Sequence, residues 1–148
     1  MNLRRNIYLL NTDLAFSSIS SLKKLISNKE ISPVELVKMF VERIQKYNPK
    51  LNAYLAVSAE KALVAAKKTE SSVLKNQPIG PLGGIPISVK DLELTEGITT
   101  TMGSLVFKDR IPSENSIVVE RLLAAGAIIL GKTNTPEFGL CATTDNRL

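Results

Sequence analysis

Apolar residues recur at helical spacing through the first half of the chain, a pattern that predicts a layer of helices. A first helix, capped by Ser17 or Ser18, is predicted to end near Asn28. An Ala-rich helix is predicted from about residue 58 to residue 73. A third helix lies between these two and is the most clearly marked of the three.

That middle helix has the strongest start signal in the chain. Ser32 can serve as the N-cap, Pro33 fits the first helical position because no N–H is needed there, and Glu35 completes a capping box. The pair Asn48-Pro49 is expected to end the helix. Its predicted apolar face comprises Val37, Phe40, Val41 and Ile44.

After residue 75 the pattern changes to short apolar runs separated by Gly and Pro. Residues 76–84 are expected to form a loop, and residues 85–89 a strand that Lys90 and Asp91 close. Residues 97–104 (GITTTMGS) are expected to form a loop or a short strand.

A further helix is predicted with Ser113 or Asn115 as its cap and Gly126 as its stop. Residues 127–130 read as a buried strand, and residues 131–134 as the turn after it. Strand, helix and strand at this spacing predict a right-handed βαβ unit with parallel strands. The fold class is therefore α/β: a helical layer at 1–75, then the start of a mixed sheet at 76–148, in one incomplete domain.

Charge and composition exclude several classes of function. The net charge is +5, but Lys and Arg are spread among acidic residues and aromatic residues make up only 5%, so we expect no direct contact with nucleic acid. The apolar runs at residues 7–10 and 122–130 are too short for a signal peptide and a membrane span, respectively. We therefore expect no membrane association and a cytoplasmic location.

The absence of histidine restricts the chemistry further. With no His and one Cys, the chain contains no Ser-His-Asp or Cys-His nucleophile system, no HExxH zinc site and no internal disulfide. Residues 126–133 match the letters of a phosphate loop, but the residues between the two glycines are Ala-Ile-Ile-Leu, which we expect to be committed to a sheet. No cofactor and no metal are predicted, and a general base must be a carboxylate, a Lys, a Tyr or the α-amino group.

Residues 80–134 read GPLGGIPISVKDLELTEGITTTMGSLVFKDRIPSENSIVVERLLAAGAIILGKTN. This stretch closely resembles the opening of the amidase signature family. The matching pieces are the Gly-Pro-Leu-x-Gly-Ile-Pro-Ile-x-Val-Lys-Asp strand, the Thr-Thr-x-Gly-Ser loop, the Val-Val-Glu-Arg-Leu-x-Ala-Ala-Gly-Ala helix and the Gly-Lys-Thr-Asn turn. Residues 135–146 continue the resemblance, and the helices before residue 53 look like the family's N-terminal layer.

The resemblance implies amide (C–N) bond hydrolysis through a Ser-cisSer-Lys triad, with Lys90 as the catalytic lysine. A free lysine has a pKa near 10.4, so a lysine that acts as a base needs a site that favours its neutral form. The family's two serines lie in Gly/Ser-rich stretches that these 148 residues do not contain. We expect the chain alone to be an inactive or incomplete amidase. Other motif residues are expected to be mostly structural: Asp91, Thr100, Gly103, Ser104, Thr133 and Asn134.

Two further interpretations remain open at this point. The chain could be a non-catalytic module that complements a serine-bearing partner chain. It also resembles the A subunit of the glutaminyl-tRNA amidotransferase, which works with partner subunits. The expected partners are a small-molecule amide substrate, if the site is completed, and a second copy or another chain that covers the exposed edge of the sheet.

Overall fold

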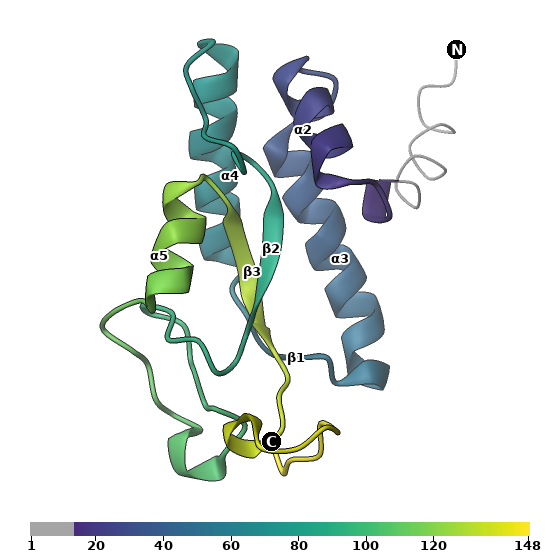
Figure 1. Ribbon diagram of the computed structural model, residues 1–148. Coiled ribbons are helices and arrows are strands. Elements are labelled where there is room, and N and C mark those ends of the chain that lie inside the picture. Colours follow the sequence, from purple (N-terminus) through teal and green to yellow (C-terminus); the bar gives the residue numbers. More distant parts are fainter. Residues whose placement is uncertain (1–13) are drawn as a thin grey trace.

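The computed structural model describes residues 14–148 as a small mixed sheet with helices on both faces (Figure 1). The apolar run at residues 7–10, which bears on the signal-peptide question, lies outside the described residues. The α-helices are α2 (Ile19–Ser27), α3 (Pro33–Leu51), α4 (Ala59–Leu74) and α5 (Ile117–Ala124). The strands are β1 (Tyr54–Val57), β2 (Pro86–Lys90) and β3 (Ile128–Thr133), and two 3₁₀ turns are η1 (Leu105–Phe107) and η2 (Glu137–Gly139).

The sheet has the order β1-β3-β2, so β3 is its central strand. Strands β2 and β3 run parallel, which confirms the βαβ prediction, while β1 pairs antiparallel with β3. The mixed α/β class predicted from the sequence is thus confirmed. In the described part of the chain, β2 is an edge strand with one pairing partner.

Two hydrophobic layers hold the sheet between the helices. On one face, Ile128 and Leu130 of β3 pack against α3 and α4. On the other face, Val89 and Ile129 pack against Val119 of α5. A third cluster joins α2 to α3 beside the start of β2; its buried members are Leu22, Ile26, Leu36, Met39, Val73 and Ile85.

Helix α3 begins as predicted but ends later. Ser32 accepts hydrogen bonds from the N–H groups of Val34 and Glu35, and the capping box is complete. The predicted stop at Asn48-Pro49 is wrong, because the helix continues through Pro49 to Leu51. The proline ring fixes φ near its helical value, so Pro49 costs the last turn one hydrogen bond without ending it.

Other elements also differ from the sequence predictions. Strand β2 covers Pro86–Lys90 rather than residues 85–89, so Lys90 lies within it. Strand β1 was not predicted; it has only four residues and exists through its pairing with β3. Helix α5 is capped by Ser116 rather than by Ser113 or Asn115. Strand β3 extends to Thr133, so three of the four residues predicted as a turn belong to the sheet and only Asn134 follows it.

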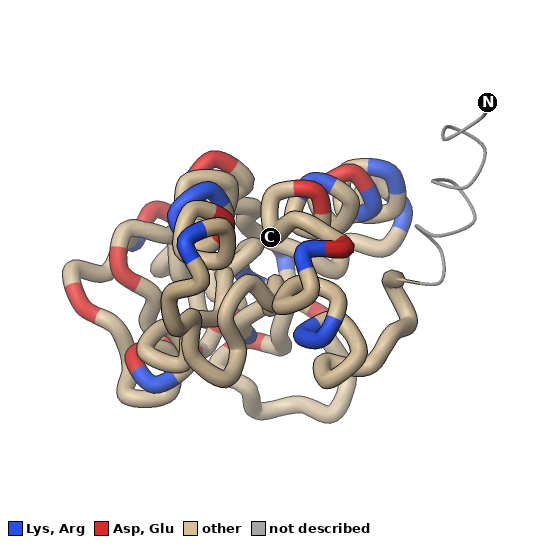
Figure 2. Tube along the Cα trace, turned by 90° about the horizontal axis from the view of Figure 1, so that it is seen from above, with Lys and Arg blue, Asp and Glu red and all other residues tan. Residues whose placement is uncertain are grey.

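Basic and acidic residues are mixed along the described chain. Figure 2 shows Lys and Arg interspersed with Asp and Glu along the described chain, on the helices and on the loops alike. Within residues 14–148, no helix is long and apolar enough to cross a membrane.

Candidate active site

Lys90 is the last residue of β2 and lies at the carboxyl end of the parallel pair. Its register partner on β3 is Thr133, whose own partner on β1 is Tyr54, so these three residues form one row across the sheet. Paired residues point to the same face, and Tyr54 also bonds through its hydroxyl to Ser88, two residues before Lys90. Lys90 therefore lies with these hydroxyl groups at the end of the sheet face that Ile128 and Leu130 line further along β3. This polar end is the polar face of Lys90.

The Lys90 side chain is exposed. Among residues 14–148, no hydrogen bond or ion pair involves its Nζ atom. The apolar side chain of Val89 belongs to the opposite face, where it packs with Ile129 and Val119. The described part of the chain thus does not bury the Lys90 side chain.

Asp91 follows Lys90 and points to the other face, where it is fully buried. Its N–H continues the ladder to the Thr133 carbonyl at 3.0 Å, and its carbonyl accepts the Met102 N–H at 3.0 Å. Its Oδ2 accepts the Thr101 N–H at 2.9 Å and also the Thr101 hydroxyl. Its Oδ1 has no hydrogen bond to a described residue, but lies 3.7 Å from the ammonium nitrogen of Lys132.

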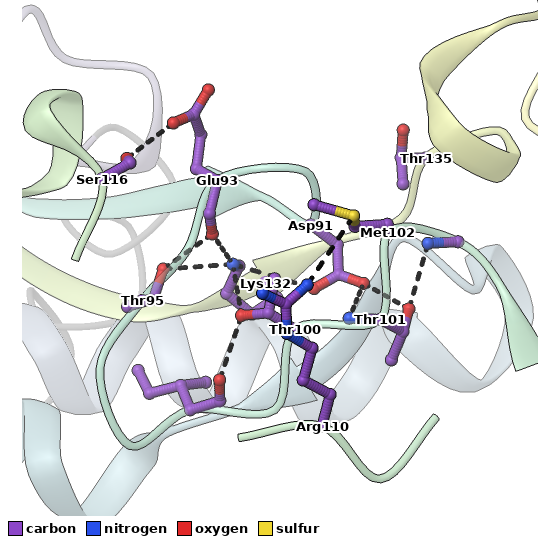
Figure 3. A network of polar contacts seen from close by, with 12 residues as sticks. Asp91, Glu93, Thr95, Thr100, Thr101, Met102, Arg110, Ser116, Lys132 and Thr135 are labelled. Atoms are coloured by element: carbon purple, nitrogen blue, oxygen red, sulfur yellow. Dashed lines mark hydrogen bonds and ion pairs between the residues drawn. The ribbon is translucent and has the colours of Figure 1, made fainter. Parts of the chain in front are cut away.

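Lys132 is the other half of this buried ion pair and has 0% side-chain exposure. Its Nζ donates to the Glu93 carbonyl, to the Thr95 hydroxyl at 3.1 Å and to the Thr100 hydroxyl at 3.0 Å (Figure 3). A lysine ammonium has three N–H donors, and these three acceptors account for all of them.

Burial lowers the pKa of Lys132 to about 8, against the opposing charges of Asp91 and Glu93. Lys132 is therefore predominantly protonated at neutral pH. A perturbed pKa is often a mark of a functional residue. Here the amine is fully buried and its hydrogens are committed, so it has no access to a substrate.

The sequence does not predict Lys132 as a site residue, because the apolar pattern ends the strand at Leu130. The rejection of the phosphate-loop interpretation agrees with the structure. Gly131 and Lys132 pair with Ser88 and Val89 of β2, so the stretch that matches the loop pattern lies in the sheet. The signal that could have revealed Lys132 is its place two residues after an apolar run that is typical of a strand buried on both faces.

The other motif residues are engaged in packing and hydrogen bonds. The Ser104 hydroxyl donates to the Glu137 carboxylate at 2.5 Å, and the Asn134 amide donates to the Asn52 carbonyl at 2.9 Å. A Cβ on Gly103 would meet the Thr135 carbonyl oxygen at 2.7 Å, and its φ of +71° favours glycine. Within the described chain, no three His, Cys, Asp or Glu side chains gather in a group that could hold a metal ion.

Comparison with known proteins shows the family to which the chain belongs. The family model described as Amidase matches residues 35–148. The chain belongs to the amidase signature family. It is 42% identical over 130 residues to the A subunit of a glutamyl-tRNA(Gln) amidotransferase from Trichodesmium erythraeum (strain IMS101), an alignment that covers 88% of this chain and 27% of the relative.

Solved amidase signature structures share the fold. A bacterial aryl acylamidase of the family matches with a TM-score of 0.83 at 30% identity, over 88% of this chain and 28% of the other. A peptide amidase from Stenotrophomonas maltophilia matches with a TM-score of 0.79 at 29% identity, over 84% of this chain and 26% of the other. The chain thus spans little more than a quarter of the length of the family members that it matches.

Proposed function

We propose that this chain supplies the catalytic lysine, Lys90, of an amide-hydrolysing site. Membership of the amidase signature family supports C–N bond chemistry. The observation that carries the assignment to Lys90 is its position at the carboxyl end of β2, with its amine uncommitted among the described residues. Open α/β sheets place their sites at this end of their strands.

In the proposed reaction, neutral Lys90 accepts a proton, through a bridging serine, from a nucleophilic serine. The serine oxygen then forms a bond to the amide carbonyl carbon, and the C–N bond breaks as the nitrogen leaves with a proton, as ammonia or an amine. Water releases the acid from the acyl-enzyme.

Both serines must come from outside these 148 residues, so the isolated chain is proposed to be inactive on amides. When they are present, the polypeptide that brings them is also proposed to cover the polar face of Lys90 and to favour its neutral form.

A chimera tests this proposal. The chain replaces the matched segment of the Trichodesmium erythraeum relative, and ammonia release from glutamine and from simple primary amides is measured. Lys90→Met is expected to reduce kcat by roughly 10³-fold, within the range for loss of a general base. Lys67→Met removes an exposed lysine on α4 and serves as the matched control. An active chimera that tolerates Lys90→Met, or an inactive chimera of an active parent, would contradict the proposal.

A second candidate function is that of the A subunit in an amidotransferase. The 42% identity to such a protein exceeds the 29–30% identity to the two solved amidases. This interpretation predicts a stable complex between the chimera and the other subunits of the Trichodesmium enzyme. It also predicts a glutaminase rate that rises when those subunits and their tRNA substrate are added. A free-standing amidase would show neither.

A further inference from the structure

The ion pair of Asp91 and Lys132 lies behind Lys90, on the opposite face of the same strand end. We propose that Asp91 and Lys132 are positioning residues for Lys90, which fix the end of β2 and the loop after it in one arrangement. The proposal deepens the function proposed above and rests on it, because it assigns a role relative to the catalytic lysine. Among the described residues, no side-chain hydrogen bond or ion pair joins Asp91 or Lys132 to the Lys90 side chain.

An irregularity in the sheet brings Lys132 to this place. Ile87 pairs with Ile129, but the next residue, Ser88, pairs with Gly131, so Leu130 is an extra residue on β3. Regular alternation would put Lys132 on the same face as Ile128 and Leu130, toward α3 and α4. The shift reverses that order and turns Lys132 to the face of its partner Val89.

Together the two side chains hold the chain at several separate points. Lys132 binds the carbonyl of Glu93 and the hydroxyls of Thr95 and Thr100, which lie in the loop after β2. Asp91 binds the backbone and the hydroxyl of Thr101 (Figure 3). The loop from residue 92 to residue 101 is thereby folded back onto the strand that carries Lys90.

The backbone around Lys90 is held at the same time. The Lys90 carbonyl accepts the Glu93 N–H at 3.0 Å, and the Asp91 N–H and carbonyl bond to Thr133 and Met102, each at 3.0 Å. Lys90 and Asp91 are adjacent, and their side chains point to opposite faces of the sheet. Contacts that fix the Asp91 side chain therefore also fix the direction in which the Lys90 side chain points. A proton-transfer group must be held within hydrogen-bond reach of its partner, so such support affects the reaction itself.

An apolar side chain at position 132 could not replace the charge and the N–H donors of Lys132. A methionine at position 132 would fill similar space, but it has no donors for the three oxygen atoms that Lys132 binds. The carboxylate of Asp91 would then also lose the ammonium 3.7 Å away. We therefore expect Lys132→Met to release the loop even where the fold survives.

Amide hydrogen exchange of the chain tests the arrangement without any activity. In Lys132→Met, the Thr101 and Met102 amides are expected to lose their protection and to exchange nearly as fast as unstructured amides. Amides in the middle of α3 are expected to exchange faster, because the fold is less stable, but to stay protected. Loss of protection in α3 as well would show that the lysine stabilises the whole fold, and would overturn the positioning role; so would unchanged exchange at Thr101 and Met102. If Lys132→Met does not fold, Thr100→Val, which removes one acceptor and keeps the ion pair, is measured in the same way.

Kinetics of the chimera defined above test the connection to Lys90. Lys132→Met and Asp91→Asn are each expected to lower kcat at least about tenfold with KM changed less than about twofold, because both side chains are fully buried and support the site from behind. The double variant is expected to be no worse than the poorer single variant, since the two residues act as a unit. Unchanged kcat per folded protein in both single variants overturns the proposal. If the unsubstituted chimera is inactive, the proposed function fails, while the exchange experiment still decides whether the pair positions the loop.

Discussion

Lys90 and Lys132 are the same residue type near the same end of the sheet, yet their surroundings are opposite. Lys90 leaves the polar face, is exposed and has no partner among the described residues. Lys132 leaves the opposite face, is fully buried and binds three oxygen atoms beside Asp91. One amine is available to react, whereas the other has all of its donors engaged within the fold.

The contrast shows that a shifted pKa does not by itself identify a base. Burial lowers the pKa of Lys132 to about 8, the range in which a lysine would be useful for proton transfer. Access decides the matter, because a base must reach the proton that it takes. Lys132 instead joins Asp91, at the end of β2, to the loop that follows this strand.

The largest predicted effect follows from this difference. Lys132→Met is expected to reduce the free energy of unfolding by about 3–5 kcal/mol, because it leaves the buried Asp91 carboxylate without its counterion. Lys90→Met, at an exposed position, is expected to change it by less than about 0.5 kcal/mol. Denaturant unfolding of the two variants measures both. Similar losses of unfolding free energy in both variants would contradict the assignment of different roles to the two lysines.

A somewhat smaller effect is expected in the pH dependence of stability. The pKa of Lys132 is about 8 in the folded chain and 10.5 when unperturbed, so between these values the unfolded state binds more protons and stability rises with pH. Below pH 8 both states are protonated, and the contribution is constant. The stability advantage of the wild type over Lys132→Met should grow by up to about 3 kcal/mol across this window. Denaturant unfolding of both proteins at pH 7.5, 8.5 and 9.5 checks the sign, and a constant difference contradicts it.

The sequence predicts the place of Lys90 at a strand end but not the burial of Lys132, and the reason is physical. The strand 85–89, its closing Lys90 and the parallel partner strand follow from apolar periodicity and from turn residues, which are local signals. The inward direction of Lys132 depends on the shift at Leu130, which is a property of how two strands pair. Strand β1 was missed in the same way, because four residues become a strand only beside β3. The end of α3 was predicted too early, since a proline near the last turn is tolerated.

The smallest predicted effect concerns the polar face of Lys90. The Tyr54 hydroxyl pairs with Ser88 there, and Tyr54 is only partly buried. Tyr54→Phe removes that hydroxyl and keeps the ring. We expect the free energy of unfolding to fall by about 0.5–1 kcal/mol or less, because water can hydrogen-bond to Ser88 instead. The matched substitution on the other face is Thr100→Val, which removes a buried hydroxyl bonded to Lys132 and should cost about 1–3 kcal/mol. Unfolding measurements on both variants compare the two faces directly. If Tyr54→Phe lowers the free energy of unfolding as much as Thr100→Val does, the hydroxyl groups beside Lys90 stabilise the fold. That result would contradict the view that this face is available for chemistry.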